Sequence, residues 1–246
     1  MSTHFKKAYH SLVNRLTTTE QTREAMSLAV GGNYDTVGIL ERELLVQHGL
    51  GENDYLIDVG CGSGRLTRPL SEYLNGSYLG LDIEQSLIDF AKDSVERPDW
   101  QFKITEGVHI PEQDSQADMI CFFSIFTHLL YEETYRYLQE SMRVLKPGGK
   151  IIFSFLEFEI PDQWVVFEAN MLHASEGDPL MIFMDRFAIR AFAKNIGLEV
   201  VHIIDGNKAH IPIQEPLTFD NGQTICDKGR LGPIGQSVCV LQKPIG

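Results

Sequence analysis

Residues 56 to 64 read Leu-Ile-Asp-Val-Gly-Cys-Gly-Ser-Gly, an apolar run that enters a turn of three alternating glycines. The apolar run predicts a buried strand, and the glycines let the backbone leave the sheet sharply and allow a ligand to approach its amides. Arg65 then begins a helical pattern, whose N-terminal amides and positive dipole end point toward the same place. A strand, a glycine turn and a helix in this order predict a site for a nucleotide-like cofactor.

A dinucleotide-binding fold is the obvious alternative, because its fingerprint Gly-x-Gly-x-x-Gly also follows a strand. The spacing here is Gly-x-Gly-x-Gly. The position that the fingerprint reserves for its third glycine holds Arg65 when counted from Gly60, and Thr67 when counted from Gly62. The sequence therefore fails this fingerprint in both registers.

Two further patterns follow the glycine turn. Ser77-Tyr-Leu-Gly-Leu-Asp82 predicts a second strand with a carboxylate at its end, and Leu145-Lys-Pro-Gly-Gly-Lys150 predicts a turn into another buried strand. The two oxygens of Asp82 could accept both hydroxyls of a ribose. The alternative is that Asp82 caps the helix that begins at Glu84.

The glycine turn, Asp82 and Leu-Lys-Pro-Gly-Gly together resemble the class I S-adenosylmethionine-dependent methyltransferases. The resemblance covers about residues 34 to 205, and the last strand recurs near the C-terminus. It implies an α/β fold: a Rossmann-like, doubly wound, mostly parallel seven-stranded sheet with helices on both faces. To this fold the sequence adds N-terminal helices and a substrate-side insertion.

Alternating strand and helix patterns support this fold class. Glycine and proline turns separate them, and unbroken apolar runs such as residues 118–123 indicate strands covered on both faces. The predicted strands are 55–59, 78–81, 100–104, 118–123, 150–155, 198–204 and 237–241, and the predicted helices of this domain are 65–74, 84–93, 132–143 and 186–195.

The chain divides into an N-terminal helical cap, residues 1–50, and a methyltransferase domain, residues 51–246. Two long segments exceed the minimal core, the insertion 157–185 and the connection 206–235. Long segments of this kind in a compact domain are usually functional or add structure. We expect both of them, with the N-terminal helices, to form walls of an acceptor pocket, although interface loops are an alternative.

Composition restricts the function. The chain has 246 residues and a formal net charge of −13. This charge argues against binding to a phosphate backbone, so no nucleic-acid partner is expected. No apolar run approaches the ~20 residues of a membrane span, and the start of the chain is too polar for a secretory signal, so we expect a cytoplasmic protein without a membrane partner. The oligomeric state is left open.

Cysteine usage agrees with a reducing compartment. The four cysteines are scattered and form no Cys-x-x-Cys pair, which argues against a zinc site or a disulfide framework. No metal is expected. These cysteines are Cys61, Cys121, Cys226 and Cys239.

The resemblance implies that S-adenosylmethionine is the cofactor, and it implies a role for each matching position. The glycines would line the methionine and ribose portions, Asp58 would lie near the amino end and Asp82 would take the ribose hydroxyls. Ile83, Glu106 and Gly107 would contact adenine, although Thr105-Glu106 replaces the usual Gly-Asp. The carbonyl of Phe123 would accept from the ammonium. The implied cofactor residues are Asp58, Gly60, Gly62, Gly64, Asp82, Ile83, Glu106, Gly107 and Phe123.

His128 is the candidate general base, because it lies just past the fourth strand and histidine titrates near neutrality. A base is needed only if the acceptor must lose a proton. The alternative is that His128 has a capping or packing role.

The candidate acceptor-binding residues are three aromatic residues and a histidine: Tyr34, Phe126, Trp164 and His173. The alternatives are that the aromatic residues only pack in the protein and that the histidine is a solvated surface residue.

Three functions remain open. The first is methyl transfer to an oxygen or nitrogen of a small-molecule acceptor. The second is methylation of a macromolecule, RNA or protein, although Phe123-Ser-Ile-Phe does not supply the Asn/Asp-Pro-Pro-Tyr pattern typical of base-nitrogen methylation. The third is a non-catalytic module that binds a nucleotide cofactor.

Overall fold

The computed structural model describes residues 3–17, 23–173, 181–225 and 231–246. Its centre is a seven-stranded sheet in the order β3-β2-β1-β4-β5-β11-β6. Neighbouring strands are parallel from β3 to β5, and β11 runs antiparallel to both β5 and β6. The predicted fold class is therefore confirmed. The strands are β1 (Leu56–Val59), β2 (Tyr78–Asp82), β3 (Gln101–Ile104), β4 (Ala117–Phe122), β5 (Leu145–Phe155), β6 (Glu199–Ile204) and β11 (Ser237–Gln242).

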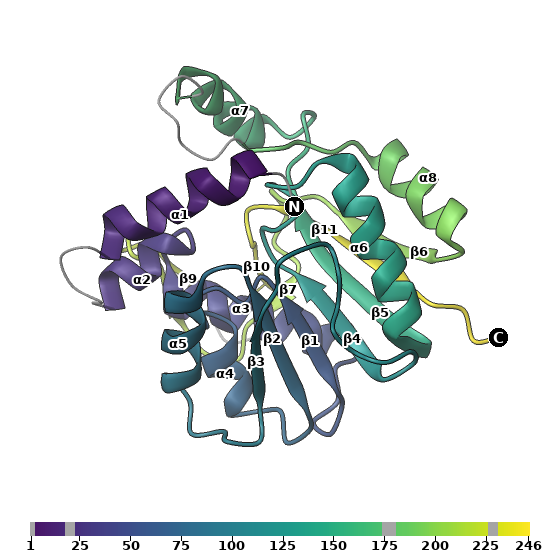
Figure 1. Cartoon of the computed structure of the whole chain (residues 1–246). Coiled ribbons are helices and arrows are strands. Elements are labelled where there is room, and N and C mark those ends of the chain that lie inside the picture. The colour runs from purple at the N-terminus through teal and green to yellow at the C-terminus, as the bar shows by residue number, and fades with distance from the viewer. Residues whose placement is uncertain (1–2, 18–22, 174–180, 226–230) are drawn as a thin grey trace.

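Helices cover both faces of this sheet, and Figure 1 shows α6 and α8 together on the near face. Along β4, Ile120 and Phe122 point to the core under α6 and α8, whereas Met119 and Cys121 point to the core under α3 and α4. This alternation is the period of two that a strand buried on both sides requires. The helices are α1 (Thr3–Thr17), α2 (Arg23–Ala29), α3 (Tyr34–Gln47), α4 (Thr67–Ser71), α5 (Gln85–Asp93), α6 (Tyr131–Val144), α7 (Pro161–His173) and α8 (Arg186–Ile196).

The helix expected over residues 65–74 is much shorter, because α4 covers only Thr67–Ser71. Pro69 lacks the backbone N–H that would donate to the carbonyl of Arg65, which removes one hydrogen bond at the start of the helix, although the Arg68 amide still donates to the Gly64 carbonyl at 3.2 Å. Arg65 lies in the turn before α4 rather than within the helix.

The Lys-Pro-Gly-Gly segment forms a bulge within β5 rather than a turn before it. The partners of β4 jump from Ala117 opposite Leu145 to Met119 opposite Lys150, and Gly148 has a φ of 81°. The extra residues loop out between these two pairs, which a glycine with positive φ permits.

The two additional segments each contain structure of their own. The insertion 157–185 contains α7, and its residues 174–180 lie outside the described part. The connection 206–235 forms two small antiparallel pairs, one of which packs against α3; its residues 226–230 lie outside the described part. In Figure 1, α1 and α7 lie above the upper ends of the strands. The small strands are β7 (Ile211–Pro212), β8 (Leu217–Thr218), β9 (Thr224–Ile225) and β10 (Leu231–Gly232).

Among the described helices, none has the length and apolar character needed to cross a membrane. The third N-terminal helix, α3, contributes fully buried leucines to the core on one face of the sheet. The domain boundary near residue 50 stays a prediction.

Candidate active site

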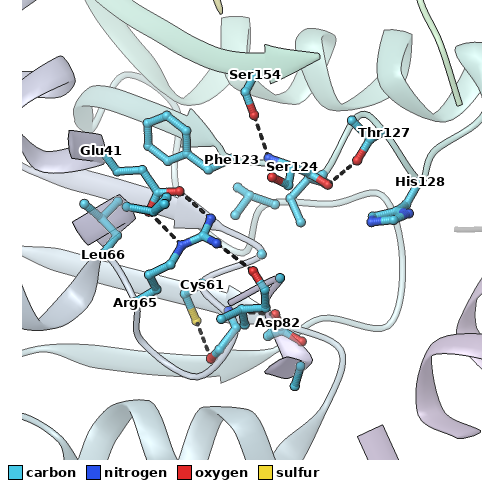
Figure 2. Close-up of a pocket in the computed structure, with 18 of the residues that line it drawn as sticks. Glu41, Cys61, Arg65, Leu66, Asp82, Phe123, Ser124, Thr127, His128 and Ser154 are labelled. Carbon is cyan, nitrogen blue, oxygen red and sulfur yellow. Dashed lines mark hydrogen bonds and ion pairs between the residues drawn. The ribbon is translucent and has the colours of Figure 1, made fainter. Parts of the chain in front are cut away.

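A cavity of about 500 Å³ opens at the carboxyl ends of the strands, where ligands bind in open α/β sheets. Its floor is formed by the ends of β1, β2 and β4. Its walls come from α1, from the segment between α2 and α3, and from the residues before β11. Figure 2 shows part of this lining. Of the predicted site residues, Asp58, Gly60, Gly62, Asp82, Ile83, Phe123 and His128 line the cavity.

The turn after β1 requires glycine at two positions of the cavity floor. Gly60 and Gly62 have φ angles of 80° and 54°, in the left-handed region that favours glycine. A Cβ on Gly60 would lie 1.9 Å from Ile125 Cδ1, and a Cβ on Gly62 would lie 2.5 Å from Val30 Cγ1. The two glycines therefore keep the floor free of side chains that would collide with the cavity walls.

The amides of this turn hold it against the second strand. The N–H groups of Gly60 and Cys61 both donate to the carbonyl of Leu81, at 2.6 and 3.0 Å. Gly64 does not line the cavity; a Cβ there would lie 3.0 Å from Ala91 of α5. Gly64 thus allows close packing between the turn and α5, and its predicted contact with the cofactor stays a prediction.

Asp82 joins the turn to the second strand. Its Oδ2 accepts from the amide of Gly62 at 2.9 Å, and its Oδ1 accepts from the amides of Ile83 and Glu84 at 2.7 and 3.0 Å. A carboxylate offers about four acceptor positions. One acceptor position remains on Oδ2, so the backbone hydrogen bonds of Asp82 leave room for a ribose hydroxyl, and that contact stays a prediction. Burial raises its pKa to about 6, although the three backbone hydrogen bonds act in the opposite direction.

Asp58 lies at the end of β1 and is 2% exposed. Its carboxylate accepts from the Tyr78 hydroxyl at 2.9 Å, and the Cys121 thiol lies 3.5 Å from its other oxygen. Burial raises the pKa of Asp58 to about 7, and the nearby carboxylates of Glu41 and Asp82 also raise it. A cation bound in the cavity would favour the ionised form of this group.

The predicted adenine contacts are only partly on the cavity wall. Ile83 and Thr105 line the cavity, and the Thr105 hydroxyl donates to the carbonyl of Gly107 at 3.0 Å. Glu106 is exposed, and neither Glu106 nor Gly107 lines the cavity. Thr105 therefore lines the cavity, whereas Glu106, the predicted acidic contact that follows it, does not.

The loop after β4 is held in a strained conformation. Phe123 lines the cavity, and Ser124 follows it with a φ of 59°, unusual for a residue other than glycine. Three hydrogen bonds fix Ser124: its amide donates to Ser154 Oγ at 2.7 Å, its carbonyl accepts from Thr127 Oγ1 at 2.6 Å, and its hydroxyl accepts from Gln236 Nε2 at 3.0 Å. Strain that is fixed in this way is typical of functional sites.

His128 lines the same cavity, as the sequence predicted for a residue just past the fourth strand. Its amide donates to the carbonyl of Ile125 at 3.0 Å, which fixes the backbone at the end of this loop. Figure 2 shows its ring beyond Thr127, on the opposite side of Ser124 from Arg65 and Glu41. The position suits a base, and the catalytic role stays a prediction.

An ion pair over the glycine turn was not predicted. Arg65 donates from Nη2 to Glu41 Oε1 at 2.5 Å and from Nη1 to the carbonyl of Val30 at 2.6 Å. Glu41 is 2% exposed, and its burial raises its pKa while Arg65 lowers it. The pair ties α3 and the segment before it to the turn. Its only signal in the sequence is a glutamate three and four positions before Leu44 and Leu45, on the face of the helix that these leucines bury.

Gln236 is a second residue that was not predicted. It lines the cavity, and its Oε1 is buried and has no hydrogen-bond partner among the described residues. Because β11 is antiparallel, the start of this strand lies beside the end of β5, where Ser237 pairs with Phe155. No signal in the sequence marks this position, because the antiparallel pairing of β11 is a property of the folded sheet.

The predicted acceptor residues lie elsewhere. Tyr34 is buried and donates to the carbonyl of Ser63 at 2.5 Å, and Phe126 is 1% exposed in the core against Phe122. Neither lines the cavity. Trp164 lies on α7, 42% exposed, with its ring 5.1 Å from Phe167. His173 is the last residue of α7, and its side chain lies outside the described residues.

The cap and the long connection meet at the mouth of the cavity. The amide of Asn33 donates to Asp220 Oδ2 at 2.6 Å, and the amide of Asp220 donates to Asn33 Oδ1 at 2.8 Å. The hydroxyl of Thr36 donates to the carbonyl of Thr218. The two segments are thus joined beside residues 31–33, which line the cavity.

In the described part of the chain, no group of three or more His, Cys, Asp or Glu side chains is arranged to hold a metal ion. Cys61, Cys121 and Cys239 are buried free thiols. Cys226 lies outside the described residues.

Comparisons with known proteins agree with this geometry. Residues 57–153 match the family model described as a methyltransferase domain. The ubiquinone biosynthesis O-methyltransferase of Coxiella burnetii is 30% identical over 102 residues, which is 41% of this chain and 42% of that protein. The chain thus matches about two fifths of the length of this curated relative.

Solved structures share the fold over nearly the whole chain. A methyltransferase solved with the Trm112 methyltransferase activator of Haloferax volcanii has a TM-score of 0.63 at 18% identity, covering 98% of this chain and 97% of that chain. Magnesium protoporphyrin IX methyltransferase from Synechocystis, solved with bound SAH, has a TM-score of 0.61 at 14% identity, covering 98% and 96%.

Proposed function

The chain belongs to the class I S-adenosylmethionine-dependent methyltransferase family, and from this membership we propose that it transfers a methyl group from S-adenosylmethionine to an oxygen or nitrogen of a small-molecule acceptor. One observation carries the proposal. Asp82, at the end of β2, is hydrogen-bonded to the glycine turn and lines the same cavity as Asp58 and His128. One cavity thus contains the proposed ribose contact Asp82, the buried carboxyl group of Asp58 that could bind a cation, and the candidate base His128.

The residues present fit this cofactor. Gly60 and Gly62 leave the floor free of side chains, and Asp82 keeps one acceptor position for a hydroxyl. Asp58 would hold the ammonium of the amino-acid end, and Ile83 with Thr105 would enclose the base. When bound, S-adenosylmethionine would supply a methyl group on a sulfonium: the acceptor's lone pair would bond to the methyl carbon, and the carbon–sulfur bond would break with its electrons left on sulfur.

The protein's part in this reaction is mainly to position the acceptor. Holding a nucleophile and a methyl group in line lowers the barrier without further machinery. The fixed loop of Ser124 places His128 at the side of the cavity opposite the Arg65–Glu41 pair. There, the imidazole would take the proton that a hydroxyl acceptor must lose, whereas an amine that is already neutral needs no base.

The walls of the cavity favour a small acceptor. The mouth is bounded by residues 31–33, which are joined to the long connection through the two Asn33–Asp220 hydrogen bonds. The lining combines apolar side chains with a few polar groups, as small-molecule sites do. The net charge of −13 gives no general attraction for nucleic acid. The curated relative from Coxiella burnetii also carries the name of a small-molecule O-methyltransferase.

Calorimetry with purified protein tests the cofactor. We expect S-adenosylmethionine and S-adenosylhomocysteine to bind with micromolar dissociation constants, about −7 to −8 kcal/mol. Binding of NAD in place of both would contradict the proposal.

A labelling assay then tests the acceptor class. The protein is incubated with labelled S-adenosylmethionine and a panel of phenols, alcohols and amines, and parallel incubations contain total RNA or a protein extract. Label that appears only in RNA or protein would contradict the small-molecule assignment.

A further inference from the structure

The inner face of α1 reaches the cofactor end of the cavity. Tyr9 and Leu12 lie three positions apart, on one side of this helix, and both line the cavity that Asp82 and Ile83 also line. The sequence predicted the N-terminal helices as walls of the acceptor pocket. The structure instead brings α1 to the ends of β2 and β3.

Two polar contacts fix α1 in this position. His10 Nδ1 lies 3.0 and 3.1 Å from the two carboxylate oxygens of Glu84, two residues past the end of β2. Lys6 Nζ donates to the backbone carbonyl of Glu106 at 2.6 Å, two residues past the end of β3. The helix therefore spans the two strand ends between which Ile83 and Thr105 line the cavity.

The Tyr9 side chain lies close to the groups that would hold a ribose. Its hydroxyl donates to the carbonyl of Ala29 at 3.4 Å. Burial raises the pKa of Tyr9, and the charges of Asp82 and Glu84 raise it further, so the phenol stays neutral at physiological pH. A neutral aromatic ring beside Asp82 and Ile83 is suited to contact with a nucleoside.

We propose that Tyr9 and Leu12 of α1 form the roof of the adenosine site, and that α1 belongs to the cofactor site rather than to the acceptor pocket. This inference rests on the proposed function. The ligand that it concerns is the adenosine half of the cofactor, which lies between the floor at Asp82 and Ile83 and the roof at α1.

The buried anchor of α1 lies next to this roof. Val13 is 1% exposed and packs in a small cluster with Met26 and Leu87. Leu12 is not part of this cluster, whereas Tyr9 packs against it. A loss of affinity therefore reports on the roof when the variant keeps the stability of the wild type.

The test measures the affinity of the full-length protein for two probes by calorimetry. S-adenosylhomocysteine contains both halves of the cofactor, whereas 5′-methylthioadenosine contains the adenosine half without the amino acid. We expect Tyr9→Ala to weaken both by the same factor, roughly tenfold, as expected when an aromatic ring that contacts a base is removed. Tyr9→Phe should bind both probes as the wild type does. Ser11→Ala, on the exposed side of the same helix, is the matched control and should change neither affinity.

Thermal unfolding of each variant shows whether it is folded. If Tyr9→Ala does not fold, Tyr9→Leu replaces it, because leucine keeps an apolar side chain against the cluster. Unchanged affinity of the folded variant for both probes would overturn the inference. A loss confined to S-adenosylhomocysteine would also overturn it, because Tyr9 would then act on the amino-acid half. Wild-type protein that binds neither probe would instead overturn the proposed function.

Discussion

The floor and the roof of the cavity are built in different ways. The floor residues Asp58, Gly60, Gly62, Asp82 and Ile83 all come from two successive strand ends. The roof and walls come from α1, from the segment around residues 28–33 and from residues 234–236, which lie at opposite ends of the chain. Local sequence motifs therefore specify the floor, whereas long-range packing specifies the roof.

The two parts also differ in what stabilises them. The floor is fixed by backbone hydrogen bonds to Leu81 and by the carboxylate of Asp82. The roof and walls are fixed by side chains: His10 and Lys6 hold α1, whereas the Arg65–Glu41 ion pair and the paired hydrogen bonds of Asn33 and Asp220 hold the walls. Variants that act on one part alone can test whether binding depends on both.

The largest effect is expected where the wall docks on the floor. A Cβ on Gly38 of α3 would lie 2.2 Å from the carbonyl oxygen of Arg65, a backbone atom that cannot rotate away. Alanine favours a helix over glycine by about 1 kcal/mol, but this gain is smaller than the cost of forcing the two segments apart. We expect Gly38→Ala to lower the free energy of unfolding by about 3 kcal/mol in urea denaturation.

Gly107→Ala is the matched control, because a Cβ there would have no atom within 4 Å. Its free energy of unfolding should stay within about 0.5 kcal/mol of the wild type. Equal stability of the two variants would show that α3 is not docked tightly on the glycine turn.

The second effect concerns catalysis at the wall. If the acceptor is a hydroxyl, His128→Ala should lower turnover by roughly a hundredfold and leave the affinity for S-adenosylhomocysteine nearly unchanged. The rate should recover in part at high pH, where the acceptor ionises without a base. His109→Ala is the control, because this histidine is exposed and lies outside the cavity lining. Wild-type turnover in His128→Ala would assign that residue a structural role.

Most of the fold was predictable because strand ends carry local signals. Apolar runs bounded by glycine, proline and acidic residues placed the strands of the central sheet close to their observed bounds. The helix expected over residues 65–74 is shorter in the structure, where α4 covers Thr67–Ser71 and Pro69 removes the hydrogen bond to the carbonyl of Arg65. The Pro-Gly-Gly segment was taken for a turn because a bulge and a turn need the same residues, and only the pairing with β4 distinguishes them.

The site residues also divide into those that a local sequence signal marks and those that it does not. Asp58, Gly60 and Asp82 could be predicted as cavity residues because each lies at the end of an apolar run. An aromatic residue in a helical or loop segment gives no signal that separates a core position from a cavity wall, so Phe126 was placed in the acceptor site although it packs in the core. Tyr9 and Gln236 reach the cavity only through tertiary packing, which no short motif encodes.

The third effect concerns the floor. Asp82→Ala should weaken binding of S-adenosylhomocysteine by at least about 1.5 kcal/mol, or more than tenfold, because a charge-assisted bond to a hydroxyl is lost and the turn loses its bond at Gly62. Calorimetry at a temperature where the variant is folded measures this change. Asp89→Ala, an exposed carboxylate on α5, is the control and should bind normally. Normal affinity in the Asp82 variant would leave that residue with its structural role alone.

The smallest effect concerns the charge of the Asp58 carboxyl group in the floor and its influence on the free energy of unfolding. The pKa of Asp58 is raised from 3.8 to about 7 by burial, so between these values the unfolded chain has lost a proton that the folded protein retains. Stability from this group is therefore present at low pH and is lost as the pH rises through about 7. Asp58→Asn removes this dependence while its amide oxygen can still accept from Tyr78. We expect the free energy of unfolding of this variant, relative to that of the wild type, to rise by at least about 1 kcal/mol between pH 5 and pH 8.

The same variant should bind S-adenosylhomocysteine less tightly and 5′-methylthioadenosine equally well, because only the former brings an ammonium to the carboxylate. Urea unfolding at the two pH values, with calorimetry at pH 8, measures both effects. A stability difference that does not change with pH would show that Asp58 is ionised in the folded protein. In that case the floor would already carry a buried negative charge before any ligand binds, and Tyr78 with Cys121 would be the groups that stabilise it.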